Sequence, residues 1–257
     1  MSTGINFLDE VWNPISGCQG KGCKCRETCW ARDMVTRFPQ IHGWDPDTED
    51  GHVRGYSPLE FSKVQFHPDR LEKPLHWRKL RRIGVCFMGD LFDEGVAYKW
   101  IDKVWQIARD SYHTYFFLTK QPEKMIGWWL EKERWSVENV FWGVSITDQE
   151  DADRMIPELL RIPGKHWVSY EPCLSNIDLT KLFKRHPTID LLIMGCESGP
   201  NRRHVNINAL RSIRYQAWAA GVLLWVKQME INGKVTGDMK LFPEDLQVRQ
   251  LPEGGKS

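Results

Sequence analysis

Four cysteines lie in one glycine-rich segment of the chain, WNPISGCQGKGCKCRETCWARDM. They are Cys18, Cys23, Cys25 and Cys29, separated by four, one and three intervening residues. Soft thiolates select zinc, copper(I) or iron–sulfur clusters. The spacing is not the paired C-x-x-C of a zinc ribbon, and no histidine stands nearby to complete a Cys/His zinc site. The segment is therefore predicted to hold a metal centre, and an iron–sulfur cluster is favoured.

Three thiolate ligands on a 4Fe–4S cluster leave one iron open to a small ligand, which makes such a centre catalytic rather than structural. Cys18, Cys25 and Cys29 are the preferred ligands. Cys23 is left open as a fourth ligand, as a replacement for Cys25 or as a free thiol. The alternative is a structural zinc or a redox-sensitive thiol patch.

A second group of polar residues follows short apolar runs that are typical of β-strands. Because the carboxyl ends of parallel strands meet on one face, these side chains predict a single pocket lined with both charges. The plainer alternative is that its charged members pair with one another as buried ion pairs or cap helices. The group comprises Asn13, Asp90, Lys120, Ser145, Glu171, Glu197, Ser198, Lys227 and Gln228.

The elements that position these residues alternate along the chain. Short runs rich in β-branched and aromatic residues are separated by segments of helical spacing, such as Tyr98–Asp110, Gln149–Arg161 and Asn208–Ala220. With a first strand at Phe7–Trp12, about seven strands are expected. This order predicts an α/β fold with parallel strands, a (βα)-repeat barrel of the TIM type, full or partial. A flat doubly wound sheet is the second choice.

A length of 257 residues suits one barrel domain. We expect that domain to span residues 1–232, with an insertion at about 34–82 in which only Glu72–Leu80 has helical character. Residues 233–257 are expected to form a C-terminal tail that frays.

Composition narrows the class of partner. Hydrophobic residues are 41% and charged residues 27% of the chain, as in a globular protein, and the net charge of +1 gives no global argument for a nucleic-acid partner. The first ten residues lack the pattern of a signal peptide, and no stretch approaches the roughly 20 apolar residues of a membrane-spanning helix. A cytoplasmic location without membrane contact is expected.

Several longer motifs, in order, resemble the phage-associated radical-S-adenosylmethionine-like proteins that carry an N-terminal three-cysteine motif. The resemblance spans about residues 12–229. The family motif places six and then two residues between its cysteines, so Cys18, Cys25 and the Cys29-Trp30-Ala31 end match it, whereas the three-residue second gap and the additional Cys23 depart from it. The motifs are WNPISGC, CKCRETCWA, MGDLFDE, FFLTKQPEKM, VFWGVSITDQEDADRMIPEL, YEPCLSNIDL, GCESGPNRR and AAGVLLWVKQ.

The resemblance implies a radical-enzyme barrel in which a 4Fe–4S cluster reduces S-adenosylmethionine to a 5'-deoxyadenosyl radical. By position, Gly89 and Asp90 would hold the methionine end, Ser145 the ribose, and Gly195 and Glu197 the adenosine. Asn13 and Ser198 complete the predicted cofactor-binding set.

The predicted catalytic residues are Lys120, Glu171 and Lys227, which would face the substrate. The resemblance also implies an electron donor as a partner and the cytoplasm of a phage-infected or bacterial cell as the location.

The substrate is expected to be a small molecule, a nucleotide or a nucleic-acid base. This expectation depends on the phage association and on a basic rim at Arg202, Arg203 and His204 that suits phosphate groups. Two other function classes stay open. One is a binding or scaffold protein with a structural iron–sulfur or zinc site, and the other is a metal-dependent hydrolase that uses Asp90, Glu171 and Glu197.

Overall fold

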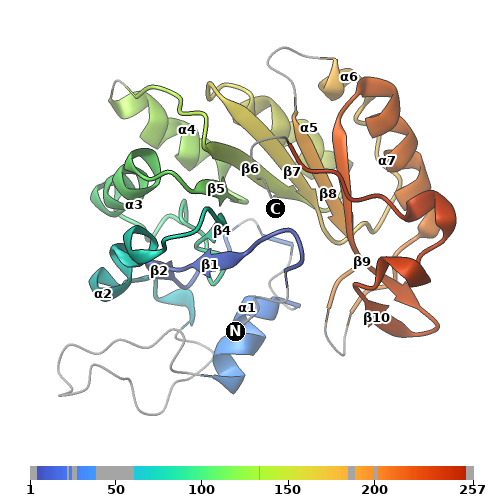
Figure 1. The fold of residues 1–257 in the computed structure, drawn as a ribbon, viewed down its shortest axis with the longest axis horizontal. Helices are drawn as coiled ribbons and strands as arrows, with labels where there is room; N and C mark the ends of the chain where they lie inside the picture. Colours follow the sequence, from blue (N-terminus) through green and yellow to red (C-terminus); the bar gives the residue numbers. More distant parts are fainter. Residues whose placement is uncertain are drawn as a thin grey trace.

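The computed structural model describes residues 5–21, 23–24, 28–38, 61–132, 134–184, 189–198 and 202–252. Its main element is a mostly parallel, strongly curled sheet with the order β1-β4-β5-β6-β7-β8-β9-β10 (Figure 1). Seven strands run parallel, and only β10 pairs antiparallel, with β9. The strands are β1 (Glu10–Trp12), β4 (Arg82–Val85), β5 (Thr114–Phe117), β6 (Val140–Ile146), β7 (Lys165–Tyr170), β8 (Leu191–Gly195), β9 (Leu223–Ile231) and β10 (Lys234–Thr236).

The predicted α/β alternation is confirmed, and the sheet is a half-barrel rather than a closed barrel. Helices connect successive strands on the outside of the curl (Figure 1). The longer ones match the predicted segments closely, because their apolar spacing is strong. The helices are α1 (Trp30–Arg37), α2 (Pro68–Leu71), α3 (Tyr98–Asp110), α4 (Pro122–Glu131), α5 (Gln149–Leu159), α6 (Thr180–Phe183) and α7 (Ile207–Ala220).

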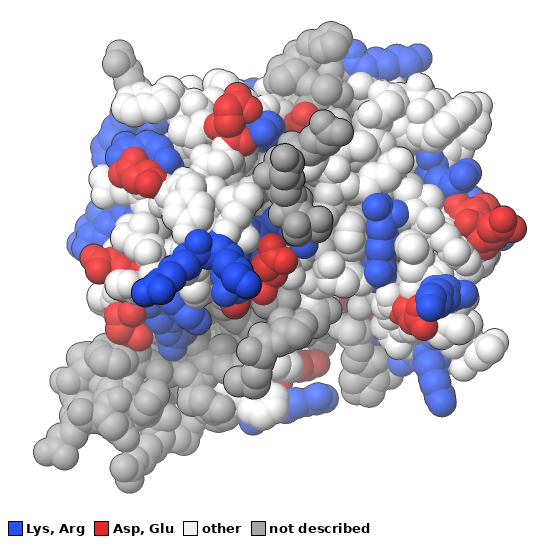
Figure 2. Space-filling model, in the orientation of Figure 1, with Lys and Arg blue, Asp and Glu red and all other residues white. Residues whose placement is uncertain are grey.

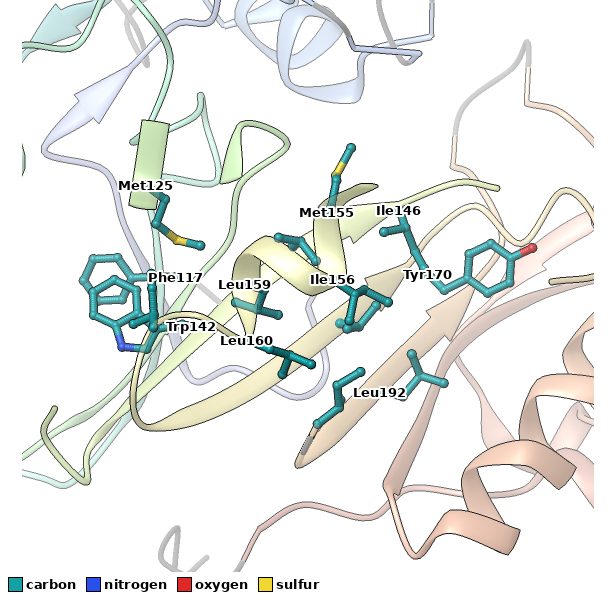
Figure 3. Packing of buried hydrophobic residues seen from close by; sticks show 14 of the residues in the cluster. Phe117, Met125, Trp142, Ile146, Met155, Ile156, Leu159, Leu160, Tyr170 and Leu192 are labelled. Carbon is teal, nitrogen blue, oxygen red and sulfur yellow. The ribbon is translucent and has the colours of Figure 1, made fainter. Parts of the chain in front are cut away.

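The larger core lies between the sheet and these helices. On α5, Met155, Ile156 and Leu159 are buried against side chains of the neighbouring strands, such as Ile146 and Leu192 (Figure 3). Such strands are apolar on both faces, as expected of a parallel sheet that is covered on both sides. This packing holds the strand ends in fixed positions.

A second, aromatic core fills the concave side of the sheet. Phe116, Trp167 and Trp225 belong to it, together with Phe7 and Leu8, which precede β1. Gly143 makes room for the Trp167 indole, since a Cβ there would lie 2.2 Å from Nε1. The first strand is therefore shorter than predicted. Phe7 and Leu8 pack into the concave side of the half-barrel instead of pairing with a neighbouring strand.

Two local expectations are wrong. Glu72–Leu80 does not form one helix, since a 3₁₀ turn, η3 (Lys73–His76), is followed by extended backbone at Trp77. Leu75 and Leu80 are both exposed, so no apolar face stabilises a longer helix there.

The segment after Gly233 does not fray within its described part. It contains two further 3₁₀ turns, η4 (Met239–Leu241) and η5 (Glu244–Leu246), and it buries Phe242 and Leu246 in the larger core. The backbone N–H of Gln250 donates to the carbonyl of Leu224 at 2.9 Å. The tail is thus part of the barrel up to residue 252.

A small antiparallel sheet, β2 (Ile15–Ser16) with β3 (Gln65–Phe66), follows β1. It brackets the insertion, of which residues 39–60 lie outside the described part. The helices of the described part include none long and apolar enough to cross a membrane.

Candidate active site

The segment from Gly17 to Cys29, here called the cysteine loop, follows β2 in the chain. In space it starts beside the carboxyl end of β4. Gly17 forms a parallel bridge with Gly89, and its N–H donates to the Met88 carbonyl at 3.0 Å. A Cβ on Gly89 would lie 2.4 Å from the Gly17 carbonyl oxygen, so only glycine permits this approach. The predicted cysteine segment therefore lies at the strand ends, where barrel enzymes place their catalytic groups.

Polar contacts attach the described parts of the cysteine loop to three different strand-end loops. The N–H of Gln19 donates to Asp93 Oδ2 at 2.9 Å, and Lys21 pairs with Glu94 at 2.8 Å, both after β4. Lys24 pairs at 2.6–3.3 Å with Asp148, Glu150 and Asp151 at the start of α5. Thr28 Oγ1 donates to Glu197 Oε1, after β8, at 2.8 Å. The loop thus spans the carboxyl face of the sheet.

Lys24 is expected to be the strongest of these attachments, because its ammonium meets three carboxylates. The variant Lys24→Met should expose the loop, so that iodoacetamide alkylates Cys18 and Cys29 several-fold faster, as followed by mass spectrometry. Lys21→Met is the control, since that pair is largely exposed and contributes little. Equal alkylation rates in the two variants would show that Lys24 does not hold the loop.

Two of the predicted metal ligands lie together. Cys18 and Cys29 are free thiols, and both pack against one small cluster that includes Phe61 and Met88. Burial raises the pKa of the Cys18 thiol well above its usual value, and the carboxylates of Asp90 and Asp93 add to this. A bound cation would reverse that balance and favour the thiolate.

The other two predicted ligands are less defined. Cys23 is disulfide-bonded, so its sulfur must be reduced before it binds a metal. Cys25 lies outside the described residues. Within the described part of the chain, no group of three or more His, Cys, Asp or Glu side chains is arranged to hold a metal ion. The ligand set therefore remains a prediction that depends on Cys25.

Asp90 joins the ends of β4 and β5. Its carboxylate, 6% exposed, accepts from Thr119 Oγ1 at 2.7 Å and from the backbone N–H of Lys120 and Phe92, both at 2.9 Å. Burial raises the pKa of Asp90, and these donors oppose the increase. Asn13 acts similarly, since its Oδ1 accepts from the N–H of Met88 at 3.1 Å. Both residues order the strand ends next to the cysteine loop.

The structure brings the three predicted catalytic residues to the concave side of the sheet. Side chains alternate between the faces of a strand, and Lys120, Glu171 and Lys227 follow concave-side aromatic residues at even spacing. Together with Ser145 and Ser169 they form a polar belt above the aromatic core. The belt comprises Lys120, Ser145, Ser169, Glu171 and Lys227.

Within the belt, Lys120 Nζ donates to Ser145 Oγ at 3.0 Å, and Ser169 Oγ donates to Glu171 Oε2 at 3.1 Å. Lys227 Nζ lies 2.9 Å from Glu171 Oε1, with the two side chains 22% and 16% exposed. That contact is an ion pair without the direction of a hydrogen bond, since Oε1 is buried and has no hydrogen-bond partner. Glu171 and Lys227 thus form the ion pair of that alternative, but they are half-buried rather than buried.

Glu197 pairs with the basic rim instead of with a belt lysine. Arg203 donates to it through Nε, through an Nη at 2.7 Å, and through its backbone N–H at 2.9 Å. Arg202 and His204 both contact Glu230, at 3.3 and 3.0 Å. The predicted phosphate-binding rim is therefore largely neutralised by carboxylates. On the face shown in Figure 2, basic and acidic side chains are likewise interspersed.

Glu197 links the cysteine loop to the rim, and its pKa predicts an acid-sensitive contact. Burial raises the pKa of Glu197, but the hydrogen bonds from Arg203 and Thr28 outweigh it, so the pKa lies below its usual value of 4.5. A carboxyl with a lowered folded-state pKa stabilises the fold above its unfolded pKa and loses that effect as the pH falls further.

Glu197→Gln should therefore cost about 1–3 kcal/mol of unfolding free energy at pH 7 and flatten the loss of stability below pH 4.5. Urea denaturation from pH 3 to 7 measures both effects. Asp153→Asn, on the exposed side of α5, is the control. If the unfolding free energy of Glu197→Gln depended on pH in parallel with that of the natural sequence, the acid-sensitive contact of Glu197 would be contradicted.

Two features of the sequence are not part of this assembly. Ser198 is exposed and makes no hydrogen bond within the described residues. The other is a basic stretch, Arg78–Arg82, which runs into the start of β4 at the amino ends of the strands, where Arg81 and Arg82 pair with Glu10 and Asp9. It is separated from the cysteine loop by the length of the sheet.

Sequence reasoning missed Lys24, Thr28, Asp93 and Ser169. A signal for the first two was present, since charged and hydroxyl residues are interleaved with the cysteines. Asp93 stands three residues after Asp90 in MGDLFDE, and Ser169 stands two before Glu171, on the same face of a strand. Their partners, however, are distant in the chain.

Comparison with known proteins gives one finding. A family model described as "Protein of unknown function (DUF5131)" matches residues 2–243. No curated protein and no solved structure matches the chain. That description names no activity, so radical chemistry and a phage association remain predictions. Because the model covers nearly the whole sequence, the chain belongs to the DUF5131 family.

Proposed function

We propose that this protein is an iron–sulfur enzyme that cleaves S-adenosylmethionine reductively and uses the resulting 5'-deoxyadenosyl radical to modify a small substrate. One observation carries the proposal: the cysteine loop lies across the carboxyl ends of the parallel strands, beside a belt of ionisable side chains. A purely structural metal needs no such neighbours, whereas a catalytic one does.

Two soft sulfur donors support the proposed cluster. Cys18 and Cys29 lie at a shared apolar cluster, and Cys25 would be the third ligand. When bound, the cluster supplies the electron for cleavage of S-adenosylmethionine. Apolar neighbours such as Phe61 and Met88 would exclude water and oxidants from it.

The remaining residues bind and orient. Gly89 lets its backbone approach the cysteine loop closely. Asp90 accepts a hydrogen bond from the backbone N–H of Lys120 and so fixes the loop that follows β4. Ser145, Gly195 and Glu197 lie at or just after the ends of β6 and β8, and the resemblance implies that they would contact the cofactor.

In the polar belt, Glu171 and Lys227 form a pair that can hold or move a proton at Oε1 or Nζ. Lys120 presents an ammonium to the same side of the sheet.

The hydrolase alternative is not favoured. Asp90, Glu171 and Glu197 each have separate protein partners instead of facing one another. A structural metal without catalysis is the alternative to be tested.

The test is anaerobic. The protein is reconstituted with iron and sulfide, both are counted, dithionite and S-adenosylmethionine are added, and 5'-deoxyadenosine is measured by chromatography. About four irons per chain and formation of 5'-deoxyadenosine are expected. Stoichiometric zinc, or a cluster that never cleaves the cofactor, would assign the site a structural role.

A further inference from the structure

Three successive backbone N–H groups fix the start of the cysteine loop. The N–H of Cys18 donates to the Phe61 carbonyl at 2.9 Å, and the N–H of Gln19 donates to Asp93 Oδ2 at 2.9 Å. The N–H of Gly20 points back and donates to the sulfur of Cys18 at 3.3 Å. Gly20 has a φ of 69°, which favours glycine. The position of the Cys18 sulfur therefore depends on how Gln19 is held.

Asp93 is the side chain that holds the backbone of Gln19. It is 0% exposed, and its carboxylate accepts two further N–H groups. The backbone N–H of Gly95 donates to Oδ1 at 2.9 Å, and Nε2 of Gln121 donates to Oδ2 at 3.2 Å. A buried carboxylate is costly unless such donors compensate it. Asp93 thus joins the loop after β4, the start of α4 and the cysteine loop.

Packing holds the side chain of Gln19 in the same place. A Cβ on Gly95 would lie 2.9 Å from Nε2 of Gln19, so the amide packs against the backbone two residues after Asp93. The next contact along the loop, between Lys21 and Glu94, is largely exposed and contributes little. The buried bond between Gln19 and Asp93 is therefore expected to stabilise this part of the loop more than that ion pair does.

The charge of Asp93 does not assist Cys18. Burial, and after it the carboxylates of Asp90 and Asp93, raise the pKa of the Cys18 thiol. Both carboxylates therefore lie near the sulfur and oppose its thiolate form. Of the two, Asp93 also holds the residue that follows Cys18, so what it contributes is geometry.

We infer that Asp93 is a positioning residue of the proposed metal centre: by accepting the N–H of Gln19, it holds the sulfur of Cys18 where the cluster binds. The positioning of Cys18 does not depend on the proposed function, whereas the cluster as its target rests on it.

The first experiment uses the full-length protein as purified, treated with EDTA and reduced with a phosphine. Iodoacetamide alkylation of Cys18 and Cys29 is followed by mass spectrometry. In Asp93→Ala, Cys18 should react about tenfold faster, because one charge-assisted hydrogen bond less shifts the local opening of the loop by about this factor. Cys29 should change less than about twofold.

Asp90→Ala is the matched control, because it removes a carboxylate that also acts on the Cys18 thiol. Its donors within the described residues are Thr119, Lys120 and Phe92, all outside the cysteine loop. Any effect of charge on the thiol is therefore present in this control, whereas the loss of the Gln19 bond is not. Cys18 should react clearly more slowly in Asp90→Ala than in Asp93→Ala.

The second experiment uses protein reconstituted with iron and sulfide. Asp93→Ala should release iron to a chelator several-fold faster than the natural sequence, and the electron paramagnetic resonance signal of its reduced cluster should change, since contacts at the sulfurs tune such clusters. Asp102→Ala is the control for stability alone. It also removes a carboxylate with three donors, on α3, and should leave the signal unchanged.

Equal Cys18 rates in Asp93→Ala and Asp90→Ala, or an equal increase at Cys18 and Cys29, would overturn the inference. Far-ultraviolet circular dichroism checks folding, and if an alanine variant does not fold, Asp93→Asn is compared with Asp90→Asn in the same way. A natural protein that never takes up iron refutes only the proposed function, because the alkylation experiment needs no metal. Cleavage of S-adenosylmethionine with Cys18 unaffected in Asp93→Ala refutes only the positioning.

Discussion

Replacing Cys18 or Cys29 by alanine is expected to reduce the reconstituted iron from about four atoms per chain to near zero and to abolish formation of 5'-deoxyadenosine. Both sulfurs belong to the cysteine loop and pack against the same apolar cluster, so each variant removes one of the sulfur ligands expected at a single centre. Iron is measured colorimetrically and 5'-deoxyadenosine by chromatography, under anaerobic conditions.

Cys173→Ala is the matched control for this experiment. It also removes one buried free thiol, but from a position after β7, where its sulfur donates to the Tyr170 carbonyl. This variant should keep its iron and its activity. Full iron content in both loop variants would remove the cysteine loop as the metal site, and loss of iron in Cys173→Ala would show that the assay reports unfolding.

Lys227→Met is expected to lower the free energy of unfolding by about 2–4 kcal/mol, because it leaves the Glu171 carboxylate mostly buried and unpaired. The double variant Lys227→Met/Glu171→Gln should recover at least half of this loss, since the uncompensated charge is then gone. Urea denaturation of the single and double variants gives the coupling energy directly.

Lys165→Met provides the control for the ion pair. Lys165 is also a strand lysine, but its partner Glu138 is 95% exposed, so its loss should cost less than about 1 kcal/mol. If the double variant regains stability but remains inactive towards S-adenosylmethionine, the pair acts in the chemistry as well as in the fold. Equal stability of Lys227→Met and Lys165→Met would contradict the buried-pair assignment.

Much of the fold could be predicted from local patterns. The helix Tyr98–Asp110 has the same bounds in the sequence and in the structure, because its apolar stripe is regular and it needs no distant partner to define it. The parallel order of the strands followed from the alternation of strands and helices. Phe7 and Leu8 were assigned wrongly to a strand. Apolar residues that pack against the concave side of a sheet have the same sequence pattern as residues of a buried strand.

The candidate site was predictable only in part. That Lys120, Glu171 and Lys227 would share a face followed from their places at strand ends. The partners of Lys120 and Glu197 did not, because Ser145 and Arg203 are as suitable chemically as any other hydroxyl or guanidinium in the chain. The basic rim is an example: three cationic side chains in a row suggested phosphate, and the fold places Glu197 and Glu230 against them.

The sequence by itself determined the α/β class, the long helices, the cysteine segment and the set of polar strand ends, because each depends on residue type and short-range spacing. Only the tertiary structure decided which charges meet. It attached the cysteine loop through Lys24 and Thr28, paired Glu171 with Lys227, and set Glu197 against Arg203. The physical reason is that ion pairing and burial depend on contacts between residues far apart in the chain, which no local pattern encodes.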